Sequence, residues 1–254
     1  LSATELGDLE AVIATAGDRT DDLTNVTASD LPLPHLALKL KEIKANVLDG
    51  VGLTLIRGFP IDRYSLRQAA TAFWAVGLHL GDAVSQNAAG HALGHVRDLG
   101  FDYSQPSSRG YQTAERLPYH CDAGDVVGLL SIKTSKTGGL SSAVSSTALY
   151  HAMIERHPEH LAVLMQLTYR DRRDEIPEGR RPWYPMPVFQ AHEGRIFGHY
   201  VRSAIRKAQR FDDVPRVTPE QEAAFDALDA LAGSEEFRLD MEFEPGDMQF
   251  VCNH

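Results

Sequence analysis

The chain has 254 residues, of which 43% are hydrophobic and 24% charged, so it can bury a sizeable core and has the composition of an ordinary globular protein. Its formal net charge of −10 argues against a general nucleic-acid binder or a protein that docks on anionic membranes, and no stretch is apolar and long enough to span a bilayer. Two distant cysteines exclude a disulfide framework and, with no secretory signal pattern at the N-terminus, favour a reducing, cytoplasmic location.

The first predicted elements are helices that enclose a short strand. Apolar residues recur at helical spacing over residues 35–49, which predicts an amphipathic helix there. The apolar run 51–56 predicts a buried strand. Ser65 is the expected N-cap of a helix that continues through Trp74.

The middle of the chain predicts short strands around a long loop. A strand is expected over residues 94–98, and the polar stretch 101–117 predicts a loop of the length that often forms a lid or binding segment. The apolar run 126–132 is typical of a buried strand, and residues 141–146 predict another after a Gly-Gly turn.

Helices and a hairpin follow. Ser146 or Thr147 can cap a helix that reaches Arg156, and Pro158 suits the first turn of the next helix. Two short apolar segments joined through a His-Glu-Gly turn predict a hairpin over residues 188–200.

The end of the chain has the clearest pattern. Thr218 should cap a helix over residues 219–231. Strict alternation over residues 237–243 predicts a strand with one buried and one wet face, and a Pro-Gly-Asp turn leads to a second strand over residues 248–252. Many short strands with inserted helices and no linker-like segment predict one domain over residues 1–254, mainly β with added helices and a jelly-roll core.

The segment Tyr119-His120-Cys121-Asp122 is the strongest candidate for chemistry. Residues two apart on an extended segment point the same way, so His120 and Asp122 can supply two ligands to one metal ion. A distant His would complete the 2-His-1-carboxylate triad of non-haem Fe(II) oxygenases. With eleven His in the chain, a chance surface pair explains this motif better than a metal site until its context, including the later Gly138-Gly139-Leu140-Ser141 turn, is considered.

In order and spacing, five segments resemble the taurine dioxygenase-like (TauD/TfdA-like) branch of the Fe(II)- and 2-oxoglutarate-dependent oxygenases. These segments are residues 51–58, 80–86, 119–122, 137–141 and 245–247. The resemblance implies a double-stranded β-helix, which is a jelly-roll variant. It also implies a dioxygenase that oxidises, commonly hydroxylates, a C–H bond of a small molecule with dioxygen, releasing succinate and carbon dioxide.

The resemblance also implies roles for individual residues. His120 and Asp122 would be iron ligands, and Ser141 would hydrogen-bond a carboxylate of 2-oxoglutarate. Because Asp122 is a carboxylate, halogenation is not expected. The third ligand, a His, would fall a few residues beyond His254, and the 2-oxoglutarate-binding Arg beyond that, so we expect the family's C-terminal strands to lie outside the given residues. A shifted register would make His254 the third ligand, but an orienting role is favoured.

Candidate substrate contacts are Gln86, Tyr119 and Arg202, although packing explains the first two equally well and pairing with surface acids explains Arg202. The alternative function is a cupin-like metal-binding protein or metallohydrolase without oxygen chemistry, or a non-catalytic relative. The substrate and any homo-oligomer stay open. Asn253 is either a polar group near iron or a strand-end residue, and Cys121 should point away from the metal into the core.

Two more clusters of polar side chains have open interpretations. An arginine cluster is either an anion site or a solvated loop, and a histidine–glutamate cluster is either a second metal site or an exposed helix face. The first consists of Arg170, Arg172, Arg173, Arg180 and Arg181, and the second of His151, His157, His160, Glu155 and Glu159.

Overall fold

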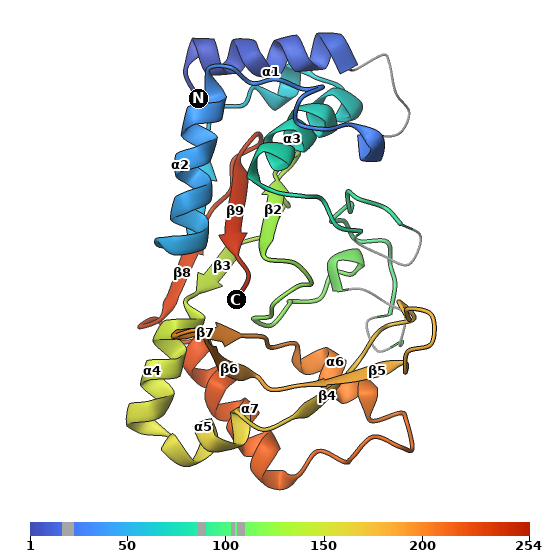
Figure 1. The fold of residues 1–254 in the computed structure, drawn as a ribbon, viewed down its shortest axis with the longest axis vertical. Helices are drawn as coiled ribbons and strands as arrows, with labels where there is room; N and C mark the ends of the chain where they lie inside the picture. Colours follow the sequence, from blue (N-terminus) through green and yellow to red (C-terminus); the bar gives the residue numbers. More distant parts are fainter. Residues whose placement is uncertain (17–22, 86–89, 103–104, 106–109) are drawn as a thin grey trace.

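The structure is a computed structural model that describes residues 1–16, 23–85, 90–102, 105 and 110–254. Its elements form an upper and a lower group in Figure 1, joined by a two-stranded ribbon. The upper group contains α1 (Ala3–Ala16), α2 (Leu36–Asp49), α3 (Leu66–Leu80), β1 (Leu53–Ile56), β2 (Val126–Leu130) and β9 (Met248–Cys252). The ribbon consists of β3 (Ser141–Val144) and β8 (Arg238–Met241).

The lower group is built from short helices and two hairpin-like strand pairs, β4 with β5 and β6 with β7. Its elements are α4 (Ser146–Arg156), α5 (Pro158–Leu164), β4 (Thr168–Asp171), β5 (Trp183–Met186), β6 (Phe189–His192), β7 (Arg195–Gly198), α6 (Arg202–Ala208) and α7 (Pro219–Ala232). Short 3-10 turns cover Leu23–Asn25, Ile61–Arg63 and Gly110–Gln112. None of the helices over the described residues is long and apolar enough to cross a membrane.

Strand β9 is the centre of the upper sheet, paired antiparallel with β1 on one side and β2 on the other. Met248 and Phe250 are buried against the helices of this group, and Gln249 between them is only 3% exposed. The Pro-Gly-Asp turn before β9 requires its glycine: Gly246 has φ of +92°, and a Cβ there would collide with the Phe59 carbonyl. This central position explains why β9 is apolar on one face yet buried on both.

Capping residues set the helix starts that the sequence predicts. Ser65 and Gln68 form a reciprocal capping box at α3, and Thr218 and Gln221 form another at α7, where Pro219 occupies the first turn. The N-cap of α4 differs from the prediction, because the side chain of Ser145, rather than that of Ser146 or Thr147, accepts a hydrogen bond from the helix backbone. The structure confirms three further predictions: the helix over 35–49, the helix that begins at Pro158, and the hairpin over 188–200.

One strand prediction is wrong, and a second is right about the strand but wrong about its burial. Residues 94–98 form no strand, because their backbone partners lie in a 3-10 turn that cannot extend a ladder: Arg97 N donates to Tyr111 O at 3.0 Å. The alternation over residues 237–243 does not bury one full face, since Leu239 of β8 is 53% exposed. β8 pairs with β3 alone in the described chain, so the ribbon is too narrow to cover that side chain.

Candidate functional site

The His120–Asp122 motif lies on the segment that leads into β2. His120 Nε2 is 3.7 Å from Asp122 Oδ1, close to the separation of two donors on one metal ion. His120 Nδ1 lies 2.8 Å from the carbonyl oxygen of Pro118, which can only accept, so Nδ1 carries the hydrogen. The lone pair of Nε2 therefore faces Asp122, and this donor pair fits a divalent iron ion.

Asn253, at the end of β9, holds the backbone of the motif. Asp122 N donates to Asn253 Oδ1 at 2.9 Å, and Asn253 Nδ2 donates to the carbonyls of Asp122 at 2.6 Å and Gly124 at 2.7 Å. Asn253 is 9% exposed, so these bonds replace the water that its amide has lost. The last strand therefore ends beside the motif, and Asn253 acts on the motif through the backbone.

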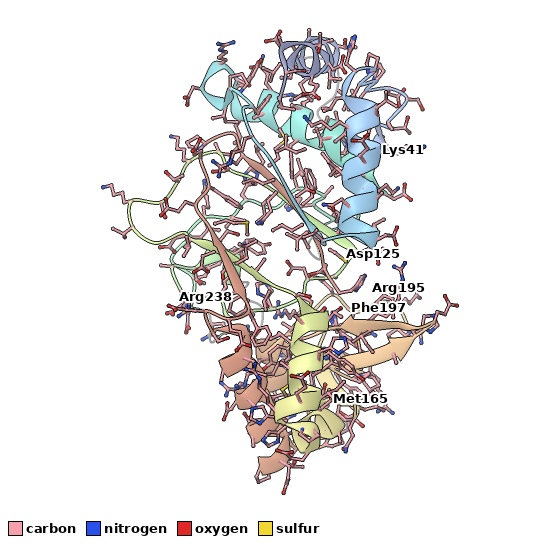
Figure 2. The ribbon with its side chains drawn as sticks, turned by 90° about the vertical axis from the view of Figure 1, so that its left-hand side faces the viewer. Lys41, Asp125, Met165, Arg195, Phe197 and Arg238 are labelled. Carbon is pink, nitrogen blue, oxygen red and sulfur yellow. The ribbon has the colours of Figure 1, made fainter. Side chains whose placement is uncertain are left out.

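His254 lies beside the same loop. Its Nε2 is 2.8 Å from Asp125 Oδ1, and its ring meets Phe197 edge-on. Figure 2 shows Asp125, Arg195 and Phe197 close together at the boundary between the two groups. His254 thus contacts the carboxylate of Asp125, three residues after Asp122.

Cys121 joins the motif to the lower group. Its backbone N donates to Tyr200 O at 2.9 Å, and its Sγ lies 3.4 Å from Gly198 O. Burial raises the pKa of the Cys121 thiol. Cys121 therefore points into the protein between the two candidate ligands, as its position on an extended segment predicts.

Sequence reasoning missed two side chains behind this junction. Arg170 is fully buried, and its guanidinium donates to the carbonyls of Met186, Pro187 (3.2 Å) and His199 (2.6 Å). Burial lowers the pKa of Arg170 to about 10. Burial, followed by the positive charges of Arg170 and His254, lowers the pKa of His199 to about 4. No residue pattern indicated this burial, because an arginine cluster is typical of an anion site or of a solvated loop.

Ser141 and Ser142 occupy opposite faces of β3. Ser141 Oγ lies 3.5 Å from Gln249 Oε1, so this hydroxyl faces the upper sheet. Ser142 Oγ instead bonds Tyr119 Oη and donates to Asp240 Oδ1 at 2.6 Å. Tyr119 is thus held by its hydroxyl and packs against the hydrophobic core of the lower group, which favours a packing role over a substrate contact.

Of the other substrate candidates, Arg202 is engaged by carboxylates of a neighbouring helix. Arg202 is paired with three carboxylates of α7 at 2.5–2.6 Å, Glu222, Asp226 and Asp229, which is the alternative that the sequence left open. Its side chain is 12% exposed and lies over the Phe225 ring. These contacts favour pairing with acids over substrate binding. Gln86 lies outside the described residues.

Most of the arginine cluster is engaged by the protein itself. Arg172 and Arg181 stack over Tyr184 and Trp183, each at 4.8 Å from the ring centroid. Arg173 Nη2 donates to Ser203 Oγ at 2.9 Å. These contacts favour a structural role over an anion site.

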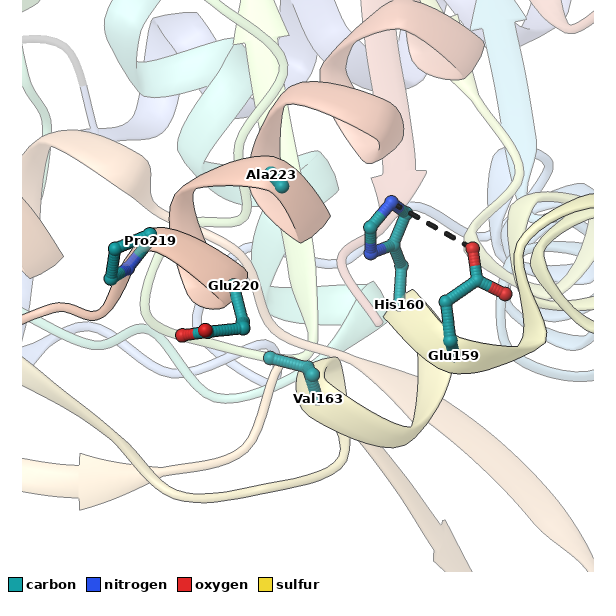
Figure 3. A pocket seen from close by; sticks show the side chains of 6 residues that line it. All are labelled: Glu159, His160, Val163, Pro219, Glu220 and Ala223. Carbon is teal, nitrogen blue, oxygen red and sulfur yellow. Dashed lines mark ion pairs between the residues drawn. The ribbon is translucent and has the colours of Figure 1, made fainter.

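Part of the histidine cluster does assemble. His157, Glu159 and His160, at the start of α5, place one donor atom each within 4.8 Å of one another. Figure 3 shows His160 and Glu159 beside a pocket of about 360 Å³ that α7 borders through Pro219 and Glu220. His151 instead packs its ring edge-on to Tyr150. Helix α5 lies in the lower group, whereas the His120–Asp122 motif leads into β2 of the upper group.

Comparison with known proteins identifies the family of the chain. The chain matches the family described as "Taurine catabolism dioxygenase TauD, TfdA family" over residues 19–254. It is 31% identical over 252 residues to FR-33289 synthase of Streptomyces rubellomurinus, covering 96% of this chain and 73% of that protein. It is 24% identical over 270 residues to the taurine hydroxylase-like protein SAT17 of Stachybotrys chartarum, covering 100% and 67%. The chain therefore belongs to the TauD/TfdA family of dioxygenases.

Solved structures share the fold. An asparagine oxygenase in complex with Fe(II), 2S,3S-3-hydroxyasparagine and succinate matches with a TM-score of 0.71 and 15% identity, covering 100% of this chain and 84% of that one. The non-haem iron oxygenase OrfP in complex with Fe and alpha-ketoglutaric acid matches with a TM-score of 0.62 and 16% identity, with the same coverage. Family membership confirms the class predicted from the sequence, a dioxygenase that uses Fe(II) and 2-oxoglutarate.

Proposed function

We propose that His120 and Asp122 hold the Fe(II) of this dioxygenase, that Ser141 binds a carboxylate of 2-oxoglutarate, and that a C–H bond of a small polar molecule is hydroxylated nearby. The observation that carries the metal assignment is the 3.7 Å approach of His120 Nε2 to Asp122 Oδ1 with His120 Nδ1 turned to Pro118. Bound iron and 2-oxoglutarate supply the oxidising chemistry, with dioxygen as co-reactant and succinate and carbon dioxide as co-products.

The protein's own part in this proposal is to fix geometry. The Pro118 carbonyl selects the His120 tautomer that leaves Nε2 free to bind, and Asn253 prevents the Asp122 backbone from turning. Cys121 anchors the same segment to the lower group from the other side. The motif is thereby held from both sides, which is what a metal site with few protein ligands requires.

The finer fold and the substrate class follow from the same proposal. The β1–β9–β2 sheet and the β3–β8 ribbon would be opposite walls of a double-stranded β-helix, an assignment supported by the Ser141–Gln249 contact between them. A small polar substrate is supported by the two solved relatives, whose complexes contain a hydroxylated asparagine and a hydroxylated arginine. Two free cysteines support a cytoplasmic location.

The test is anaerobic calorimetry of Fe(II) binding to the full-length protein and to His120→Ala and Asp122→Ala. Each substitution should lower Fe(II) affinity by more than about 100-fold, beyond the loss typical of an outer-sphere partner. His192→Ala is the matched control, since His192 Nε2 also lies 3.8 Å from a carboxylate, that of Glu193, but on an exposed hairpin. Unchanged Fe(II) affinity in both motif variants would show that the metal binds elsewhere.

A further inference from the structure

Gln249 is a buried amide in the middle of β9. Its neighbours Met248 and Phe250 face the upper helices, so Gln249 points to the opposite face of the sheet, toward the ribbon. There its Oε1 lies 3.5 Å from Ser141 Oγ, and its Nε2 lies 3.5 Å from Met241 Sδ. Ser141 and Met241 are register partners, so both contacts come from one position of the ribbon.

These contacts satisfy the amide poorly. A glutamine side chain offers two N–H donors and a carbonyl with two lone pairs, whereas an oxygen at 3.5 Å is at the limit of a hydrogen bond and a thioether is a weak acceptor. The side chain is 3% exposed, and its partners across the sheet are Leu55 and Leu129. A buried amide in an apolar row with such weak partners is unfavourable unless another group binds it.

We propose that Gln249 and Ser141 together bind one carboxylate of 2-oxoglutarate, with Gln249 Nε2 and Ser141 Oγ as the two donors. The inference rests on the proposed function, in which Ser141 alone has this role. A carboxylate is the matching partner because it only accepts hydrogen bonds and has two oxygens for two donors. On binding, Ser141 would donate its hydrogen bond to the ligand instead of to the carbonyl of Gln249. Gln249 would donate to a charged oxygen instead of to a thioether, which gives a stronger hydrogen bond.

The test measures equilibrium binding of 2-oxoglutarate to the anaerobic Fe(II)-loaded, full-length protein by calorimetry. Gln249→Met keeps the side chain's length and volume and removes its donors. It should weaken 2-oxoglutarate binding about 10-fold, as should Ser141→Ala, since each loses one bond to a charged group. Gln249→Glu should weaken it further, because a second carboxylate repels the ligand. Ser142→Ala is the matched control, as this neighbouring hydroxyl is on the opposite face of β3.

Two readouts separate this inference from a structural role of Gln249 and from the proposed function. Fe(II) affinity and the thermal midpoint of Gln249→Met should stay close to those of the unmodified protein, and its loss in 2-oxoglutarate affinity should be partly shared with Ser141→Ala in the double variant. Wild-type affinity in both Gln249 variants, with weaker binding in Ser141→Ala, would overturn the role of Gln249 alone. An unmodified Fe(II)-loaded protein that binds no 2-oxoglutarate would overturn both.

Discussion

The described chain offers two candidate metal sites, and the one with fewer donors is the proposed iron site. The α5 cluster offers three residues, His157, Glu159 and His160, with donor atoms within 4.8 Å. The motif offers two, His120 and Asp122. In exposure and donor separation the two regions are alike: Glu159 is 68% exposed and lies 3.9 Å from His160, while Asp122 is 57% exposed and lies 3.7 Å from His120.

The difference lies in what surrounds the donors. His120 is oriented by the Pro118 carbonyl, and the Asp122 backbone is fixed by Asn253 from a strand 131 positions away. Cys121, between them, is fixed by Tyr200 from a third segment. The α5 cluster draws all its donors from four consecutive residues at one helix end. Proximity of donors is therefore a weaker indication of a metal site than independent segments that fix their orientation.

The largest effect is expected for the motif itself. Asp122→Ala should reduce 2-oxoglutarate-dependent succinate formation by more than about 100-fold, because it removes a ligand rather than an outer-sphere partner. The fold should survive, since Asn253 contacts only the Asp122 backbone. Succinate measured with Fe(II), ascorbate and oxygen checks this. Turnover near that of the unmodified protein would reverse the ranking of the two regions.

Asn253→Ala tests whether the residues that fix the motif backbone contribute to metal binding. It removes three bonds to the motif loop, so Fe(II) affinity should fall about 10- to 100-fold with both donors intact. Unfolding free energy should fall by roughly 1–3 kcal/mol, because buried backbone groups lose their partners. Asn46→Ala is the control, since Asn46 also donates to a backbone carbonyl, that of Leu53, but Leu53 lies in β1, on the side of β9 opposite the strand that follows the motif. Equal loss of Fe(II) affinity in both variants would contradict the orienting role.

Acid should weaken the boundary beside the motif through His199. Its folded pKa of about 4 lies below the ordinary value of 6.5, so between these pH values the unfolded chain binds a proton that the folded chain does not. Stability from this group is therefore complete above pH 6.5 and is lost as pH falls toward 4. A single proton limits the slope to about 1.4 kcal/mol per pH unit. His199→Gln should reduce this dependence of unfolding free energy on pH, measured by urea unfolding of the metal-free protein at pH 5 and 7. The same difference between the two pH values in variant and unmodified protein would argue against burial of the neutral ring.

Local chemistry made much of the fold predictable. Capping residues such as Ser65 and Thr218 act on their own helices, and the Gly-Gly turn and the hairpin are set by residues that they contain. The exposure of Leu239 was not predictable, because alternation indicates which residues share a face and not whether anything covers that face.

The candidate site was predictable in its donors and not in its supports. His120, Asp122 and Ser141 stand in recognisable local motifs, which is why sequence alone selects them. The supports act over long sequence separations: Arg170 reaches the carbonyl of His199, and Gln249 reaches Ser141 across 108 positions. The three carboxylates that bind Arg202 lie on a different helix, so the sequence does not distinguish ion pairing of Arg202 from a role in substrate binding.

The smallest effect is expected for the α5 cluster. The double variant His157→Ala/His160→Ala removes more imidazole donors than His120→Ala, yet succinate formation should stay within about two-fold and stability within roughly 0.5 kcal/mol, as for substitutions at partly exposed sites without special roles. The reason is that neither ring contacts the segments that fix the motif; they face each other at 5.8 Å between ring centroids. Turnover and urea unfolding, compared with those of His120→Ala, check this. A loss of turnover comparable with that of His120→Ala would show that the α5 cluster, with more donors and fewer supports, binds the catalytic iron.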